Sequence, residues 1–165
     1  AGPAVTAVAD DPEGGQVLQQ CWEAWRGLPH VVRHRVQLTC VPMHDIDENA
    51  VIVNALQRHA RVLVQKSIAE GFGLTVAEGM LKGRPVVASA VGGLVDQVVD
   101  GETGYLVRDP LDLAAFGGHV AALLDDPARA HEMGEAGRQR AIDTHLGDTQ
   151  LQKWLGVLQR LSALD

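Results

Sequence analysis

Two glutamates that flank a pair of glycines are the residues of this sequence best suited to chemistry. Glu70 precedes Gly71 and Gly73, and Glu78 lies on the first turn or so of the helix expected after them. Glycines let the backbone approach a ligand closely, and the free N–H groups at the start of a helix favour an anion. Carboxylates accept hydrogen bonds from vicinal sugar hydroxyls. These residues therefore predict a site for a ligand with both phosphates and hydroxyls, although a glycine-rich turn with a capping glutamate would give the same pattern.

The segment lies where an apolar run leads into a helix, in a chain that alternates such runs with amphipathic stretches. This alternation predicts parallel strands joined by right-handed helical crossovers, so the expected fold class is α/β, a Rossmann-like doubly wound parallel sheet. Strands are expected at residues 5–9, 36–41, 62–64, 85–88 and 105–107, the third fully buried. Helices are expected at 12–27, after Asp47, at 75–82 and 94–99, after Asp109 and Asp126, and at 148–164. In such folds ligands bind outside the carboxyl ends of the strands, where the glycine-rich segment lies.

The composition excludes several other classes of protein. The chain has 165 residues, of which 46% are hydrophobic and 21% charged, which suits a globular protein of one ordinary domain or of two very small ones. A net charge of −7 argues against binding to nucleic acid or to an anionic membrane. Cys21 and Cys40 form no CxxC pair, which favours a domain of a reducing compartment, the cytoplasm.

A polar cluster after the second expected strand raises a metal-binding alternative. His44, Asp45, Asp47 and Glu48 could form a DxD-type site like that of metal-dependent sugar transferases. Asp47 has a simpler role as a helix N-cap, with Glu48 at the positive end of the helix dipole, and no second cluster completes a metal shell. We therefore expect no metal. The absence of a Gly-x-Ser-x-Gly elbow and of a Walker motif also disfavours hydrolase and P-loop chemistry.

The full string around the glycines resembles a known family. Glu-x7-Glu, filled with Gly-Phe-Gly-Leu, is similar to the donor-binding half of retaining family-four glycosyltransferases of the GT-B fold. The resemblance covers nearly the whole chain and is carried by residues 70–78, 82–88, 91–93 and 100–107. Three further stretches, residues 10–14, 65–67 and 95–99, resemble the trehalose-forming branch of that family, which joins glucose from a nucleotide sugar to free glucose.

The resemblance implies a role for each matching residue. Glu78 would hold the ribose hydroxyls of a nucleoside diphosphate sugar, and Glu70, as the catalytic carboxylate, would face hydroxyls of the transferred sugar near its reacting end. Val41 and Met43 would lie against the nucleotide base. The other donor contacts would come from the glycine loop and its neighbours, Lys66, Gly71, Phe72, Gly73, Leu74 and Thr75. In this family basic side chains neutralise the diphosphate, so neither a metal nor another cofactor is expected.

The same resemblance predicts that residues 1–165 are the donor-binding domain of a two-domain hexosyltransferase. The acceptor-binding N-terminal domain, and the βα unit whose Arg and Lys grip the diphosphate, would precede Ala1. We therefore expect the 165-residue chain to be inactive alone, with nucleotide sugar and a sugar acceptor as the partners of the whole enzyme. The alternative is a stand-alone α/β binding or interaction module without transfer. The amphipathic tail at 148–165 would lack its usual contacts, so a homodimer is expected.

Overall fold

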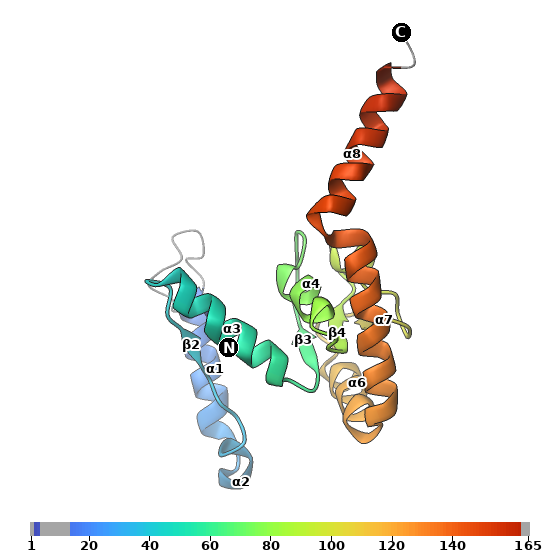
Figure 1. Cartoon of the computed structure of the whole chain (residues 1–165). Helices are drawn as coiled ribbons and strands as arrows, with labels where there is room; N and C mark the ends of the chain where they lie inside the picture. The colour runs from blue at the N-terminus through green and yellow to red at the C-terminus, as the bar shows by residue number, and fades with distance from the viewer. Residues whose placement is uncertain (1, 4–13, 163–165) are drawn as a thin grey trace. The chain divides into compact units, whose positions relative to one another are not determined.

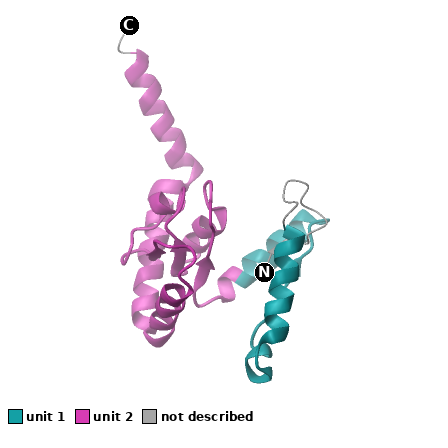
Figure 2. Cartoon of the chain, turned by 180° about the vertical axis from the view of Figure 1, so that it is seen from behind, with its two compact units in different colours: residues 1–56 teal, residues 57–165 magenta. Residues whose placement is uncertain are grey.

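The computed structural model describes residues 2–3 and 14–162, and it divides into two compact units, residues 1–56 and residues 57–165 (Figures 1 and 2). The boundary falls within helix α3 (Ile46–His59). Each unit has its own parallel sheet. The expected α/β class with parallel strand pairing is thus confirmed, and the pairing among the described residues is divided between the two units.

Unit 1 combines a short parallel sheet with helices. β1 (Gly2–Pro3) pairs with β2 (Cys40–Val41), and the helices are α1 (Gly14–Gly27), α2 (His30–Arg33) and most of α3. The strand expected at residues 5–9 lies outside the described residues. The strand expected at 36–41 is limited to its last two residues. One reason is that the carbonyl oxygen of Val36 accepts a hydrogen bond from the indole N–H of Trp25 at 3.0 Å, which gives this backbone group a partner outside a sheet.

The N-terminus of α3 corrects the predicted capping residue. Oδ1 of Asp45 accepts a hydrogen bond from the backbone N–H of Glu48 at 3.0 Å, so Asp45 and not Asp47 caps the helix. Asp47 lies inside the first turn together with Glu48, where both carboxylates face the positive end of the helix dipole. The helix therefore begins at Ile46, earlier than predicted.

The sheet of unit 2 has the order β3-β4-β5, and all three strands run parallel. The strands are β3 (Leu63–Gln65), β4 (Val86–Ser89) and β5 (Tyr105–Val107). Gln65 pairs with Ala88, and Ser89 pairs with Val107. All four residues of the central strand β4 are buried, whereas Val64 in β3 is 48% exposed. The prediction of a fully buried third strand is therefore wrong, because β3 is an edge strand of the sheet in unit 2.

Helices cover both faces of this sheet, because successive side chains of a strand point to opposite faces. Val86 and Ala88 of β4 pack in a cluster with Val76 and Met80 of α4 (Leu74–Leu81). Val87 packs in a second cluster, whose helical members come from α6 (Leu113–Asp125) and α7 (Pro127–His145). The long helix α7 contributes to both clusters, Ala141 to the first and Met133 to the second. The unit therefore has one layered core on each side of β4.

Two aspartates set the starts of α6 and α7. Asp126 caps α7 as predicted, since its Oδ1 accepts from the N–H of Arg129 at 2.9 Å and Pro127 is the first helical residue. The predicted start of α6 at Asp109 is wrong, because Asp112 caps this helix through the N–H of Ala115 at 2.9 Å. Asp109 instead accepts from the N–H of Leu111 at 2.9 Å, which forms a turn ahead of the helix.

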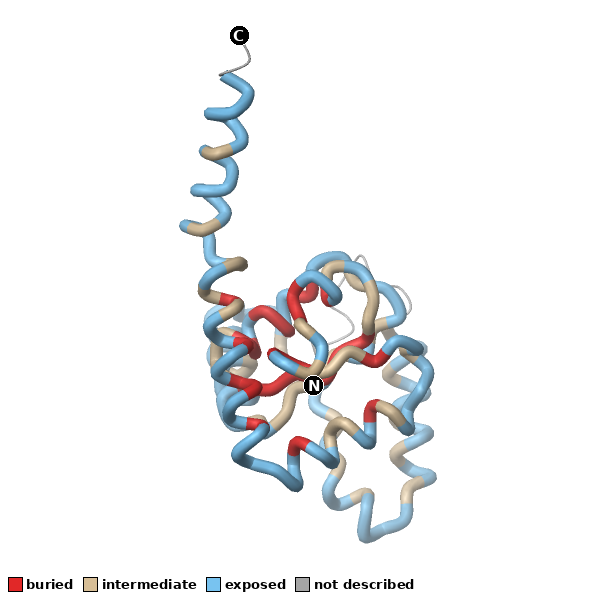
Figure 3. Tube along the Cα trace, turned by 90° about the vertical axis from the view of Figure 1, so that its right-hand side faces the viewer, coloured by how far each residue is buried: buried red, intermediate tan, exposed pale blue. Residues whose placement is uncertain are grey.

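Helix α8 (Gly147–Ser162) follows α7 and is exposed over almost its whole length (Figure 3). The side chains that form its expected apolar face are between 49% and 66% exposed: Leu151, Trp154, Leu155, Leu158 and Leu161. Helix α5 (Leu94–Gln97), shorter than expected, completes the unit. Among the described residues, no helix has the length and apolar character needed to cross a membrane.

Candidate functional site

The carboxyl ends of β3, β4 and β5 lie at one edge of the sheet in unit 2, because the three strands are parallel. The loop after β3 carries Glu70 and the glycines, and it leads into α4, which carries Glu78. The loop after β4 carries Gly92 and Gly93 and leads into α5. The fold thus brings the glycine-rich segment of the sequence to the edge where α/β proteins bind ligands.

Gly73 makes the turn from this loop into α4. It is the N-cap residue with φ +85°, in the left-handed region, and its added Cβ would overlap the side chain of Leu94. Its carbonyl oxygen accepts from the N–H of Val76 at 3.0 Å and of Ala77 at 3.2 Å. Among the described residues, no side chain caps the helix, so the N–H groups of Leu74 and Thr75 keep the free positions that a helix start provides. Both residues are exposed, which leaves these donors available to an anion.

The second loop packs directly on the first. The N–H of Gly93 donates to the carbonyl oxygen of Gly71 at 3.0 Å, and the side-chain amide of Gln97 donates to the carbonyl oxygen of Phe72. A Cβ at Gly92, whose φ is +50°, would overlap the carbonyl oxygen of Glu70. The glycine pair therefore fixes the loop that carries Glu70. Gln97, only 1% exposed, is a positioning residue that the sequence reasoning missed, and no local pattern distinguishes it.

Glu70 is half-buried and is held through one carboxylate oxygen. Its Oε2 accepts from Nε2 of Gln65 at 3.1 Å and from Oγ of Ser67 at 3.2 Å, while no described residue donates to Oε1. Gln65 also donates to Oγ of Ser67 at 3.0 Å, which closes a small network at the end of β3. One oxygen of Glu70 is therefore fixed by the protein, and the other remains able to accept from a ligand.

Glu78 is exposed on α4 and is held in a similar way. Its Oε2 accepts from Nε2 of Gln57 at 2.8 Å, and Nζ of Lys82 donates to Oε1 of the same glutamine. Gln57 is 4% exposed and is the one fully buried residue of helix α3, near its end. Within unit 2, both predicted carboxylates thus have one glutamine as a partner. The sequence reasoning missed Gln57, since a glutamine 21 residues before a glutamate carries no local signal.

The other predicted side chains of the glycine loop, Lys66 and Phe72, lie on the surface, and the Phe72 ring contacts α7. Lys66 is exposed and forms no ion pair with a described residue. Phe72 is 47% exposed, and its ring meets His145 edge to face with 5.8 Å between the centroids. Burial, together with Arg140 and Lys153, lowers the pKa of His145 below its ordinary value. The contact ties the glycine loop to the end of α7.

A cavity of about 350 Å³ lies behind the loop, next to Phe72 and Gly93. Its lining includes Asp96 and Gln97 of α5, Arg140 and His145 of α7, and Lys153 of α8. The guanidinium of Arg140 donates to the carbonyl oxygen of Gln97 at 2.7 Å and to that of Asp96 at 2.6 Å. The cavity therefore belongs to the contact between α5, α7 and α8, whereas Glu70 and Glu78 are absent from its lining.

The residues predicted to contact the nucleotide base belong to unit 1. Val41 is 3% exposed at the end of β2, and Met43 is 41% exposed in the loop that follows. Nδ2 of Asn49 donates to the carbonyl oxygen of Pro42 at 2.7 Å and approaches Sδ of Met43 at 3.2 Å. The strand and the first turn of α3 together fix this loop within unit 1.

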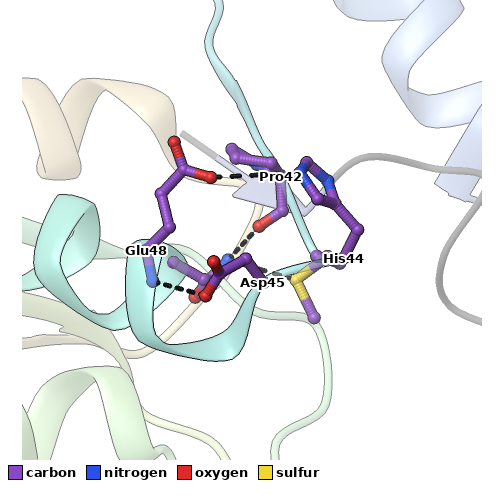
Figure 4. A network of polar contacts seen from close by, with 6 residues as sticks. Pro42, His44, Asp45 and Glu48 are labelled. Carbon is purple, nitrogen blue, oxygen red and sulfur yellow. Dashed lines mark hydrogen bonds and ion pairs between the residues drawn. The ribbon is translucent and has the colours of Figure 1, made fainter.

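The polar cluster in the same loop is organised as a helix start (Figure 4). Asp45 caps α3, and His44 faces Glu48 with 3.9 Å between Nε2 and Oε2, both side chains being exposed. Among the described residues, no three His, Cys, Asp or Glu side chains gather as metal ligands would. The structure shows a helix cap at this cluster and a surface contact between His44 and Glu48.

Comparisons with known proteins add independent information. Residues 48–140 match the family described as "Glycosyl transferases group 1". The chain is 44% identical over 152 residues to the trehalose synthase of Pyrococcus horikoshii and 49% identical over 152 residues to that of Rubrobacter xylanophilus. Each alignment covers 92% of this chain, and the chain spans about a third of the length of each relative, 34%. Among solved structures, the sucrose-phosphate synthase of Thermosynechococcus elongatus superposes with a TM-score of 0.73 at 29% identity, over 100% of this chain and 38% of that one.

Proposed function

Because this chain belongs to the glycosyl transferases group 1 family, with the GT-B fold of its structural relatives, we propose that its site binds the nucleoside diphosphate sugar donor of a retaining hexosyl transfer. One observation carries the proposal: Glu70 and Glu78, each held through a single oxygen, lie on either side of a helix start without a side-chain cap. Free N–H donors suit phosphates and free carboxylate oxygens suit hydroxyls, which are the two kinds of polar group in such a donor.

The proposed roles are those that the family resemblance implies for each group of the loop. We assign the ribose hydroxyls to Glu78 and the diphosphate to the N–H groups of Leu74 and Thr75, at the start of α4. The hexose hydroxyls near the reacting carbon fall to Glu70, whose network at the end of β3 keeps Oε1 free. In the transfer, the bond from the anomeric carbon to the diphosphate breaks, a bond to the oxygen of an acceptor hydroxyl forms, and the proton of that hydroxyl passes to an oxygen of the departing diphosphate. The diphosphate departs with the electron pair, and donors aimed at its oxygens stabilise that charge.

The acceptor and the sugar are proposed from the relatives. Two relatives at 44% and 49% identity are trehalose synthases, so we propose glucose as the transferred hexose and glucose as the acceptor. Gln65 and Ser67, which resemble the trehalose-forming branch, hold Glu70 in the structure, and this adds a physical reason to expect a common donor geometry. We further propose that the transfer needs no metal and that the protein is cytoplasmic.

Titration of the chain with nucleoside diphosphate glucoses tests the proposal. The wild-type chain, Glu78→Gln and the control Glu132→Gln are titrated calorimetrically with UDP-, ADP- and GDP-glucose. Glu132 is an exposed carboxylate of α7 paired with Arg129 at 3.6 Å, away from the loop. Glu78→Gln is expected to weaken the tightest of the three by about 1–3 kcal/mol, since charge-assisted hydrogen bonds are lost. Absence of binding by the wild type, or equal affinities for Glu78→Gln and the control, contradicts the proposal.

A second candidate function is a binding or interaction module that performs no transfer. Lys66 is the only cation between residues 66 and 75, whereas a departing diphosphate needs positive charge around it. A transfer assay with radiolabelled glucose as acceptor tests this second function. Disaccharide formation that Glu70→Ala abolishes excludes the module, whereas binding without labelled disaccharide is expected both of the module and of a donor-binding domain that is inactive alone.

A further inference from the structure

The carboxylates of Glu70 and Glu78 are held in the same way, because in each the Oε2 atom accepts a hydrogen bond from a glutamine amide. Nε2 of Gln57 donates to Glu78 at 2.8 Å, and Nε2 of Gln65 donates to Glu70 at 3.1 Å. No described residue donates to Oε1 of either glutamate. Each carboxylate is thus fixed at one oxygen and available at the other.

The orientation of the Gln57 amide follows from its neighbours. Lys82 has N–H donors and no acceptor, and an ionised Glu78 has acceptors and no donor. Only one orientation of the amide satisfies both, with Oε1 toward Lys82 and Nε2 toward Glu78. The ammonium polarises the amide, and the polarised N–H is a stronger donor to the carboxylate. Because Gln57 is 4% exposed, the amide in the middle of this chain of hydrogen bonds is shielded from water.

Glu78 needs such support because its own environment does not restrain it. The side chain is exposed on α4, and an exposed glutamate samples several rotamers. A ligand that requires one rotamer must supply the ordering free energy unless the protein has already done so. Glu70 also has a glutamine as donor, and Ser67 is a second donor to it at 3.2 Å, whereas the amide that holds Glu78 is backed by Lys82.

We propose that Gln57, backed by Lys82, is the positioning residue for the nucleotide half of the donor, and that Gln65 with Ser67 positions the residue for its sugar half. The inference rests on the proposed function, since it assigns the halves through Glu78 and Glu70. It adds residues from outside the glycine loop: the end of α3, the end of α4 and the last residue of β3. Loss of either glutamine should therefore weaken a different part of the same ligand.

Comparing a nucleoside diphosphate with its glucose conjugate separates the two halves. The nucleotide is chosen from UDP, ADP and GDP as the one whose glucose conjugate binds the wild type most tightly. Each variant is then titrated with that nucleoside diphosphate and, separately, with its glucose conjugate. Gln57→Met, which keeps the length of the side chain and removes the amide, is expected to weaken both ligands by the same factor, about 5- to 30-fold. Gln65→Met is expected to leave the nucleoside diphosphate unchanged and to weaken only the conjugate. Gln139→Met is the matched control, because this exposed glutamine bonds only Asp143 on α7 among the described residues.

Two further variants distinguish positioning from simple structural support. Gln57→Glu keeps an acceptor for Lys82 but removes the N–H donor to Glu78, so it should bind as weakly as Gln57→Met. Lys82→Met removes the group behind the amide and should weaken both ligands by a smaller factor. If Gln57→Met does not fold, as judged by circular dichroism, Lys82→Met provides the same comparison.

The outcomes separate this inference from the function on which it rests. The positioning roles would be overturned if Gln57→Met or Gln57→Glu bound with wild-type affinity. They would also be overturned if Gln57→Met, like Gln65→Met, weakened only the glucose conjugate and left the nucleoside diphosphate unchanged. Failure of the wild type to bind any of the three conjugates, or no effect of Glu78→Gln, would overturn the proposed function instead.

Discussion

Replacing Gly92 with alanine tests whether the loop after β4 holds the loop that carries Glu70. Gly92 has φ +50°, and an added Cβ would overlap the carbonyl oxygen of Glu70. The left-handed conformation costs a non-glycine residue about 1–2 kcal/mol, and inserting a methyl group into a packed contact costs about 1–3 kcal/mol more. We therefore expect Gly92→Ala to lower the free energy of unfolding by about 2–5 kcal/mol.

Gly101 offers a matched control for the conformational part of that cost. Its φ is +77°, and no heavy atom lies within 4 Å of the added Cβ among the described residues. Gly101→Ala should therefore lose only the conformational term, about 1–2 kcal/mol. The difference between the two variants then measures the overlap with the Glu70 backbone, which must move to relieve it.

Urea unfolding followed by circular dichroism gives both free energies, and calorimetric titration with the tightest nucleoside diphosphate glucose gives the affinity. Gly92→Ala is expected to weaken the ligand, because displacing the Glu70 backbone misplaces its carboxylate, whereas Gly101→Ala should bind as the wild type does. Equal losses of stability in the two variants, with equal affinities, would refute the assignment of the glycine pair as the support of the loop.

Three further predictions concern the rest of the chain. Asp45→Ala should lower the free energy of unfolding by about 1 kcal/mol and Asp47→Ala by much less, as urea unfolding would show, because Asp45 is the cap of α3. His145 has a lowered pKa in the folded chain, so the unfolded chain binds its proton more readily. Stability should therefore fall as the pH drops from about 6.5 toward that lowered pKa and stay flat above. His145→Gln should reduce this fall, and an identical pH dependence of unfolding would contradict the assignment. The exposed apolar face of α8 should cause self-association, which sedimentation velocity detects and which Leu151→Glu with Leu158→Glu should abolish; a wild-type chain that is monomeric at every concentration contradicts it.

Local sequence patterns predicted the three strands and most of the helices of unit 2, together with the strand-to-helix connection that carries the candidate site. The strands predicted at 62–64, 85–88 and 105–107 correspond to the three parallel strands at 63–65, 86–89 and 105–107, and Asp126 with Pro127 starts α7 as expected. These features depend on side-chain alternation, caps and turns, whose physical causes act over a few neighbouring residues. The Glu-x7-Glu string was sufficient to point to the family for the same reason: its glycines and carboxylates lie within one strand-to-helix connection.

Where two residues a few positions apart suit the same structural role, only the folded chain shows which of them takes it. Asp45 and Asp47 both suit an N-cap, as do Asp109 and Asp112, and the backbone geometry at each helix start selected one of each pair. Val64 looked buried because its run is apolar, but burial depends on which strand lies at the edge of a sheet.

Tertiary structure alone determined how the site is held. Gly92 reaches the Glu70 backbone from the loop after β4, Gln97 reaches Phe72 across 25 residues, and Gln57 reaches Glu78 across 21. Each of these contacts requires separate elements to pack first, because a hydrogen bond of about 3 Å fixes only groups that the fold has already brought together. The residue types thus give the chemistry of the two carboxylates, whereas the packed strands and helices around them set their orientation.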